Sequence, residues 1–170
     1  MTPVNKWKQE LPKLKEQCRN QVLQALHSGN QKEVVKALKN YVDCGFSLAN
    51  YGKNEAAIVT VVAFHGSKKG LSFLQEKGFQ LDQMPELLSC ACSFYCPNGS
   101  YVECIKYLIE NGVGVLDVGT LSKAIEQLKN RKVFLKCGEQ TPSIKVELMN
   151  IEALISRLQR RLQKISATEK

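Results

Sequence analysis

The sequence predicts an all-α fold of stacked helical hairpins, and two regularities in its 170 residues carry this prediction. The first is a pair of interleaved glycine series with a common period near 33 residues. In one series the glycines are 33 and 34 residues apart, and in the other 37 and 33: Gly45, Gly78 and Gly112, and then Gly29, Gly66 and Gly99. The second is helical spacing of apolar residues between these glycines. Because glycine commonly closes helices, the pattern indicates a repeated unit of two short helices, each ended by a glycine.

The two helices of each expected unit differ in hydrophobic pattern. Residues 33–42, 71–74 and 103–109 place apolar side chains on one face only, whereas residues 22–26, 56–64 and 87–95 are apolar almost all round. A helix that is apolar on every side is buried, so each unit pairs an inner helix with an outer one. Neither helix buries its surface alone, and the units are therefore expected to stack.

One of the inner segments conflicts with simple propensity. Residues 58–62 are β-branched throughout, which by itself favours a strand. A strand here would lie in the middle of the array without a regular partner, so we expect a helix. At the N-terminus, residues 1–15 are basic and contain Trp7, Leu11 and Leu14. They are expected to form a separate capping helix that starts after Pro3 or Pro12.

The C-terminal segment has a different pattern. Thr141 and Pro142 break the array, which divides the chain into a repeat domain (1–140) and a final helix (141–170). Its apolar residues recur at alternating steps of four and three: Ile144, Leu148, Ile151, Ile155, Leu158, Leu162 and Ile165. This heptad stripe is about three heptads long. It is expected to cover the open end of the array, to pair with a partner helix or a second copy through residues 144–165, or to lie on an anionic membrane.

The segment from Glu103 to Gly112, with the sequence ECIKYLIENG, resembles the second helix and closing turn of an ankyrin repeat. Residues 29–36 resemble the approach to the same helix. The resemblance covers about residues 16–138, or three to four degenerate units, the last being weak (121–128, then 133–138). The family's Thr-Pro-Leu-His opening is nowhere complete, so irregular loops are expected between the units. Another helical-hairpin solenoid is the alternative.

The resemblance implies that the tips between units bind a partner, together with the groove along the inner helices. Two of these tips supply the predicted partner-binding residues: Tyr51, Lys53, Glu55, Gln83, Met84 and Glu86. Tyr51 and Met84 are the expected anchors, because aromatic and methionine side chains are enriched in interface cores. The alternative is that both side chains merely pack against the next tip.

The seven cysteines favour packing over chemistry. Their number is odd and most lie in apolar stretches, which is typical of buried thiols in a reducing compartment. The closest to a metal motif are Cys90, Cys92 and Cys96, followed by Cys104. In a helix Cys90 and Cys92 point about 200° apart, and Cys104 matches a core position of the repeat, so no metal site is expected.

Catalysis is not expected either. His27 and His65 each come just before the glycine that ends an inner helix, where a histidine favours the helix dipole. The sequence has no paired carboxylates, glycine-rich phosphate loop or nucleophile elbow. We therefore predict a protein without catalytic residues or cofactors.

Charge leaves two classes of partner open. The formal net charge is +8, and its excess lies at the two ends: residues 1–20 carry five basic and two acidic residues, and residues 156–170 carry five and one. The leading hypothesis is a protein–protein interaction module (an adaptor, recruiter or inhibitor-like binder) that resides in the cytoplasm. By analogy alone, it is also compatible with an effector delivered into a host cell. The alternative is a nucleic-acid-binding protein that uses its basic terminal helices.

Overall fold

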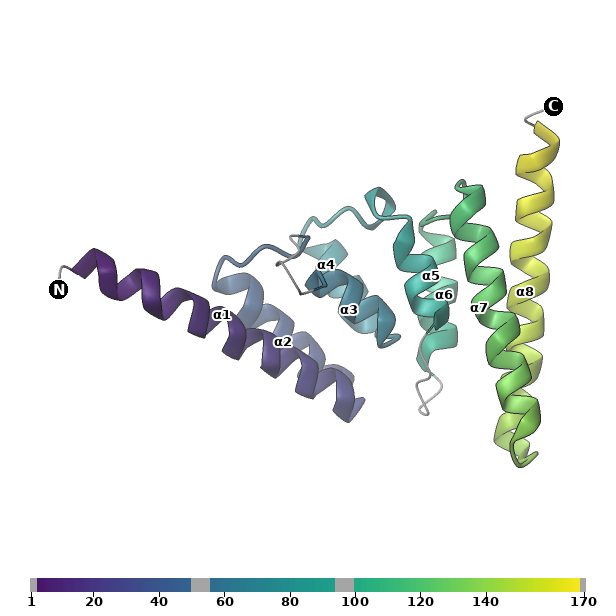
Figure 1. Cartoon of the computed structure of the whole chain (residues 1–170), viewed down its shortest axis with the longest axis horizontal. Helices are drawn as coiled ribbons and strands as arrows, with labels where there is room; N and C mark the ends of the chain where they lie inside the picture. The colour runs from purple at the N-terminus through teal and green to yellow at the C-terminus, as the bar shows by residue number, and fades with distance from the viewer. Residues whose placement is uncertain (1–2, 50–55, 94–99, 169–170) are drawn as a thin grey trace.

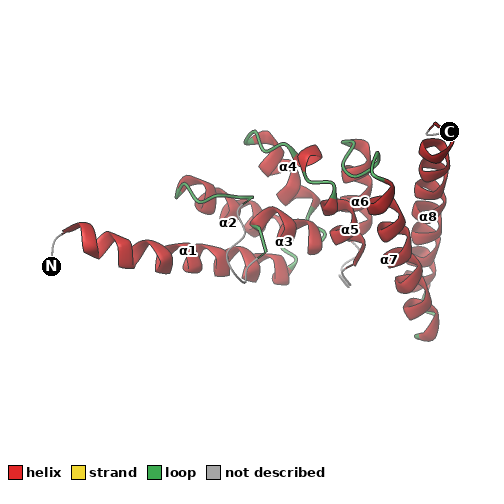
Figure 2. Ribbon diagram, turned by 45° about the horizontal axis from the view of Figure 1, so that its top comes forward, coloured by secondary structure: helices red, strands yellow, loops and turns green. Residues whose placement is uncertain are grey.

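The computed structural model describes residues 3–49, 56–93 and 100–168, and within these ranges the chain forms helices and no strand (Figure 2). The all-α prediction is confirmed. The helices are, in order, α1 (Pro3–Ser28), α2 (Gln31–Asp43), α3 (Ile58–Phe64), α4 (Lys68–Glu76), the 3₁₀ helix η1 (Leu81–Gln83), α5 (Glu86–Ser93), α6 (Ser100–Glu110), α7 (Val118–Cys137) and α8 (Pro142–Thr168). No helix in the described ranges combines the length and apolar character needed to cross a membrane.

Consecutive helices pair into hairpins, which stack in a row. α1 packs on α2, α3 on α4, α5 on α6 and α7 on α8. The first helices of the pairs contact one another in succession, and so do the second helices. The row is elongated, with the N-terminus at one end and the C-terminus at the other (Figure 1).

Glycines close the helices as the spacing predicts. Five of the six residues in the two series adopt a positive φ, between +66° and +88°: Gly29, Gly45, Gly66, Gly78 and Gly112. Around Gly78 the amide donates to the carbonyl of Gln75 (2.9 Å) and the amide of Phe79 to that of Leu74 (3.0 Å). This pair of bonds is the Schellman arrangement, which satisfies the last carbonyls of a helix. Gly99 lies outside the described residues.

The β-branched inner segment is helical, as expected. α3 buries five of its seven residues: Ile58, Val59, Val61, Val62 and Ala63. It lies between α1 and α5 and against α4, so it finds apolar neighbours on most sides. Burial in this position outweighs the preference of branched side chains for strands.

The expected N-terminal capping helix is wrong. α1 is one continuous helix of 26 residues that includes Pro12, so residues 1–15 and 22–26 do not form separate helices. Cys18 and Val22 are buried on the side that packs against α2, whereas Leu11 and Leu14 are 53% and 43% exposed. The second half of α1 packs against α2 and stabilises the helix, so the helix continues through Pro12 although a proline inside a helix is unfavourable.

The fourth hairpin also differs from the expected boundaries. Residues 121–128 and 133–137 belong to the single helix α7, which ends at the C-cap Gly138, and its partner is α8. The heptad face of α8 packs against the rest of the chain, with Ile151, Ile155 and Leu158 buried. The other four residues of the stripe are half-buried and pack against the same core: Ile144, Leu148, Leu162 and Ile165. Pairing with a second copy through residues 144–165 stays a prediction.

Candidate binding surface

The turn between α4 and α5 holds three of the predicted partner-binding residues. Gln83 is exposed and its side-chain amide donates to the Oε1 atom of Gln80. Met84 is half-buried and packs against the hydrophobic core. Glu86 is half-buried at the start of α5. The structure thus places Gln83 at the surface and uses Met84 largely for packing. Tyr51, Lys53 and Glu55 lie outside the described residues.

The turn between α6 and α7 lies directly against this one. A Cβ atom on Gly114 would come within 2.6 Å of the carbonyl oxygen of Pro85 and 3.1 Å of the Cβ of Leu88. Gly114 also has a φ of +67°, so glycine meets two requirements here: a close backbone approach and a left-handed conformation. The two turns form one continuous strip along the upper edge of the row in Figure 1, and we call residues 81–86 and 113–118 the turn edge.

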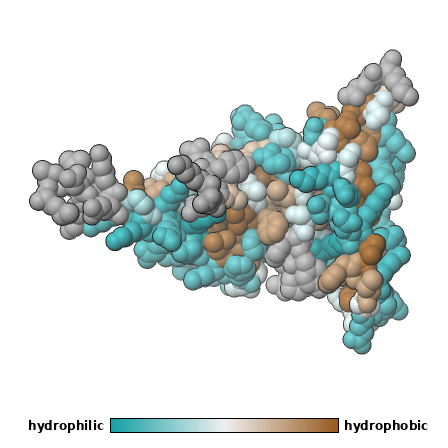
Figure 3. Space-filling model, in the orientation of Figure 1, coloured by the Kyte–Doolittle hydropathy of each residue, from teal (hydrophilic) through white to brown (hydrophobic). Residues whose placement is uncertain are grey.

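The turn edge exposes apolar side chains that are not among the predicted partner-binding residues. Leu116 is 73% exposed and Val118 is 36% exposed, and hydrophobic atoms are visible near the start of α7 in Figure 3. The Asp117 side chain caps α7 by accepting a hydrogen bond from the amide of Thr120 (2.6 Å). Hydrogen bonding to the Thr120 side chain, followed by this backbone bond, holds the pKa of Asp117 below its usual range. Leu116 therefore occupies the position before the N-cap, where a residue often packs on the helix to form a hydrophobic staple. Its exposure shows that it is directed mainly to solvent.

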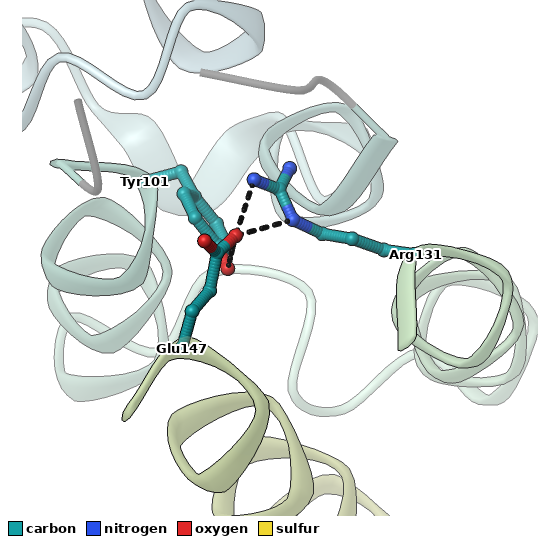
Figure 4. Close-up of polar contacts among 3 residues, drawn as sticks. All are labelled: Tyr101, Arg131 and Glu147. Carbon is teal, nitrogen blue, oxygen red and sulfur yellow. Dashed lines mark hydrogen bonds and ion pairs between the residues drawn. The ribbon is translucent and has the colours of Figure 1, made fainter. Parts of the chain in front are cut away.

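A buried polar cluster joins the last three helices (Figure 4). The Oε1 atom of Glu147 accepts hydrogen bonds from the hydroxyl of Tyr101 (2.7 Å) and from Nε (3.2 Å) and a terminal nitrogen (2.8 Å) of Arg131. The Arg131 guanidinium also lies 3.6 Å from the centroid of the Tyr101 ring. Burial, and then the bond to Glu147, raises the pKa of the tyrosine hydroxyl. Each of the three side chains is partnered within the cluster, so its geometry orients α6, α7 and α8.

The described cysteines differ in burial: three are buried, Cys90 is half-buried and two are exposed. Cys92 and Cys104 are buried in the core, and burial raises the pKa of Cys104 to about 12, which keeps it protonated. Cys44 and Cys137 are exposed. The Cys44 sulfur lies 4.0 Å from the sulfur of Cys18 on α1, and burial, followed by this contact, raises the pKa of Cys18.

The histidines of neighbouring hairpins meet each other. The ring centroids of His27 and His65 are 4.9 Å apart in an edge-to-face arrangement. Burial, and secondarily the charge of His27, lowers the pKa of His65. Among the described residues, no three histidine, cysteine or acidic side chains come together to hold a metal ion. The contact between His27 and His65 therefore packs two neighbouring hairpins together.

Comparison with known proteins gives no relative: no family model, no curated protein and no solved structure matches the chain. The interpretation of the surface therefore depends on the residues and contacts of this chain.

Proposed function

We propose that this chain is a protein-binding module of degenerate, ankyrin-like repeats that holds a protein partner along the turn edge and the adjoining inner helices. The observation that carries this proposal is the exposure of Leu116 and Val118 where two inter-hairpin turns meet. Exposed apolar side chains next to polar groups such as the exposed Asp117 are the usual composition of an interface centre and its rim.

Two features of the scaffold support this function. The stacking of hairpins gives an elongated molecule whose inter-hairpin turns lie together on one edge, which is how repeat proteins present large binding surfaces. The left-handed glycines that end the helices suit the proposed repeat, for which residues 103–112 carry the resemblance in the sequence. In this proposal the partner is recruited or sterically blocked, and no chemical step takes place.

A matched pair of surface variants tests the proposal. Leu116→Asp removes the apolar side chain of the turn edge, and Met149→Asp, at 69% exposure on α8, is a control of similar exposure elsewhere. Proteins retained by the tagged chain from cells are identified by quantitative mass spectrometry, purified, and titrated against each variant by calorimetry. We expect Leu116→Asp to weaken binding by about tenfold or more and Met149→Asp to leave it unchanged. Equal losses from both variants would contradict the proposal, and so would the absence of any partner that binds when purified.

Nucleic-acid binding remains the second candidate because α8 carries Arg157, Arg160, Arg161 and Lys164. The basic N-terminal and C-terminal helices lie at opposite ends of the row in Figure 1, so they do not form one continuous basic face. Binding to an oligonucleotide that weakens steeply with rising salt would favour this candidate.

A further inference from the structure

The first hairpin brings two thiols into contact. The sulfur of Cys18, on α1, and the sulfur of Cys44, at the C-cap of α2, lie 4.0 Å apart although 26 positions separate the two residues along the chain. A disulfide has a sulfur separation of about 2.05 Å, so the two atoms must approach by about 2 Å. α2 ends at this point, and a Cβ atom on the following Gly45 would meet no atom within 4 Å. The turn therefore has space to adjust, and rotation about the Cα–Cβ bonds of the two cysteines adds to this freedom.

The two thiols differ in their access to solvent. Cys44 is exposed, whereas Cys18 is only 2% exposed. The side-chain amide of Asn40, one turn before Cys44 on α2, donates to the Oε1 atom of Gln21 (3.1 Å) and to the sulfur of Cys18 (3.8 Å). This amide holds the register of the two helices around the pair, and a donor beside the Cys18 sulfur favours its charged form when the proton leaves. A dissolved reagent thus reaches Cys44 first, and Cys18 is in place behind it.

The first hairpin is held in the row from one side only. It forms the N-terminal end of the row, where α1 packs mainly on α2 and less extensively on α3 (Figure 1). Arg19, next to Cys18, donates to the carbonyl oxygen of Ala56 just before α3 (2.9 Å). The terminal unit of a repeat array has a neighbour on one side only, and it is the unit that opens most easily. A covalent bond between α1 and the end of α2 would therefore stabilise the least supported part of the row.

We propose that Cys18 and Cys44 form a reversible disulfide by exchange with a low-molecular-weight disulfide such as glutathione disulfide, and that this bond clamps the first hairpin. The Cys44 thiolate attacks one sulfur of the reagent, which forms a mixed disulfide and releases one glutathione thiolate. The Cys18 sulfur then gives up its proton and attacks the Cys44 sulfur, which forms the internal bond and releases the second glutathione. The protein loses two hydrogen atoms with their electrons, and one glutathione disulfide is reduced to two glutathiones. This inference does not depend on the proposed partner-binding function.

The test uses the full, reduced chain with glutathione disulfide as the probe. After incubation under native conditions, the remaining thiols are blocked with N-ethylmaleimide and the tryptic peptides are identified by mass spectrometry. Trypsin separates the two cysteines because it cleaves after Arg19 and Lys39, so the internal disulfide is seen as two joined peptides.

Three variants accompany the wild type. Cys18→Ser and Cys18→Ala each remove the thiol that completes the exchange, and using both guards against a fold that tolerates only one of them. Cys137→Ser is the control, because Cys137 is exposed on α7 and no hydrogen bond joins its thiol to a second thiol in the described ranges. Circular dichroism verifies that each variant is folded.

We expect the wild type and Cys137→Ser to give the joined peptides of Cys18 and Cys44 and to retain little glutathione on Cys44. In the Cys18 variants, the glutathione adduct of Cys44 should increase by about tenfold or more, because no second thiol displaces it. A wild-type chain that keeps glutathione on Cys44 without joined peptides would overturn the inference. Joined peptides that form only in urea would overturn it as well, because they would show that the folded hairpin does not bring the two sulfurs together.

Thermal unfolding tests the clamp itself. Oxidised Cys137→Ser should unfold at a midpoint about 5–10 °C above that of its reduced form, because the bond restricts the unfolded chain. Dithiothreitol should reverse this gain, and Cys18→Ser treated with glutathione disulfide should show none. A midpoint that does not rise when the joined peptides are present would show that the bond does not hold the hairpin and would overturn the clamp.

Discussion

Replacing Glu147 by glutamine should destabilise the fold substantially, although Glu147 lies on the last helix, α8. The glutamine keeps the size of the side chain but removes the charge that faces Arg131, whose side chain is only 6% exposed. Breaking a buried ion pair by removing one partner typically costs about 3–5 kcal/mol, since the remaining charge stays buried. Glu147 retains 20% exposure, so water partly solvates the site, and we expect a loss at or just below the bottom of this range, about 2–3 kcal/mol.

Urea unfolding followed by circular dichroism measures this loss. The control is Glu152→Gln, which disrupts the 2.8 Å pair with Lys132 at an exposed position and should leave the urea midpoint nearly unchanged. A double substitution, Arg131→Met with Glu147→Leu, removes both charges and should recover part of the lost stability. If Glu147→Gln and Glu152→Gln unfold at the same urea concentration, the cluster does not hold α6, α7 and α8 together as described.

Three further predictions concern the hairpin contacts. Gly66→Ala should lower the free energy of unfolding by about 2–5 kcal/mol, because its φ is +66° and the new Cβ would lie 2.8 Å from a neighbouring backbone atom. Gly45→Ala, with a φ of +74° and no atom within 4 Å, should cost only about 1–2 kcal/mol in the same urea titration; equal losses would refute the close approach. The pKa of His65 is lower in the folded than in the unfolded chain, so the unfolded chain binds more protons at low pH. The free energy of unfolding should therefore decrease as the pH falls below about 6.5. A His65→Gln variant with the same pH dependence as the wild type would contradict this. In a thiol-reagent assay, Cys44 should react in the folded chain and Cys104 only after unfolding, and rapid reaction of Cys104 would show that the core is open.

Much of the fold was predictable because its determinants are local and repeated. A glycine that ends a helix is required by backbone conformation, so the glycine spacing located the hairpin boundaries, and the helical period of residues 33–42 anticipated α2. The continuity of α1 was not predictable in this way. Pro12 is normally a sign of a helix boundary, and only the packing of Cys18 and Val22 shows that the helix extends through it.

The candidate surface was harder to predict because it depends on which side chains the tertiary contacts leave exposed. Met84 matched the residue type of an anchor, but it packs against the core, whereas Leu116 projects into solvent. The cluster of Tyr101, Arg131 and Glu147 joins residues 30 and 16 positions apart along the chain, and no periodic pattern connects them.

Hydrogen–deuterium exchange of the chain, alone and in complex with a purified partner, tests the central claim most directly. If the turn edge binds the partner, amide exchange should slow in residues 81–88 and 113–121. Val133 and Phe134, which are 62% and 66% exposed at the far end of α7, provide the internal comparison. Slower exchange around these two residues with no change in residues 81–88 and 113–121 would show that the partner binds elsewhere and would contradict the account.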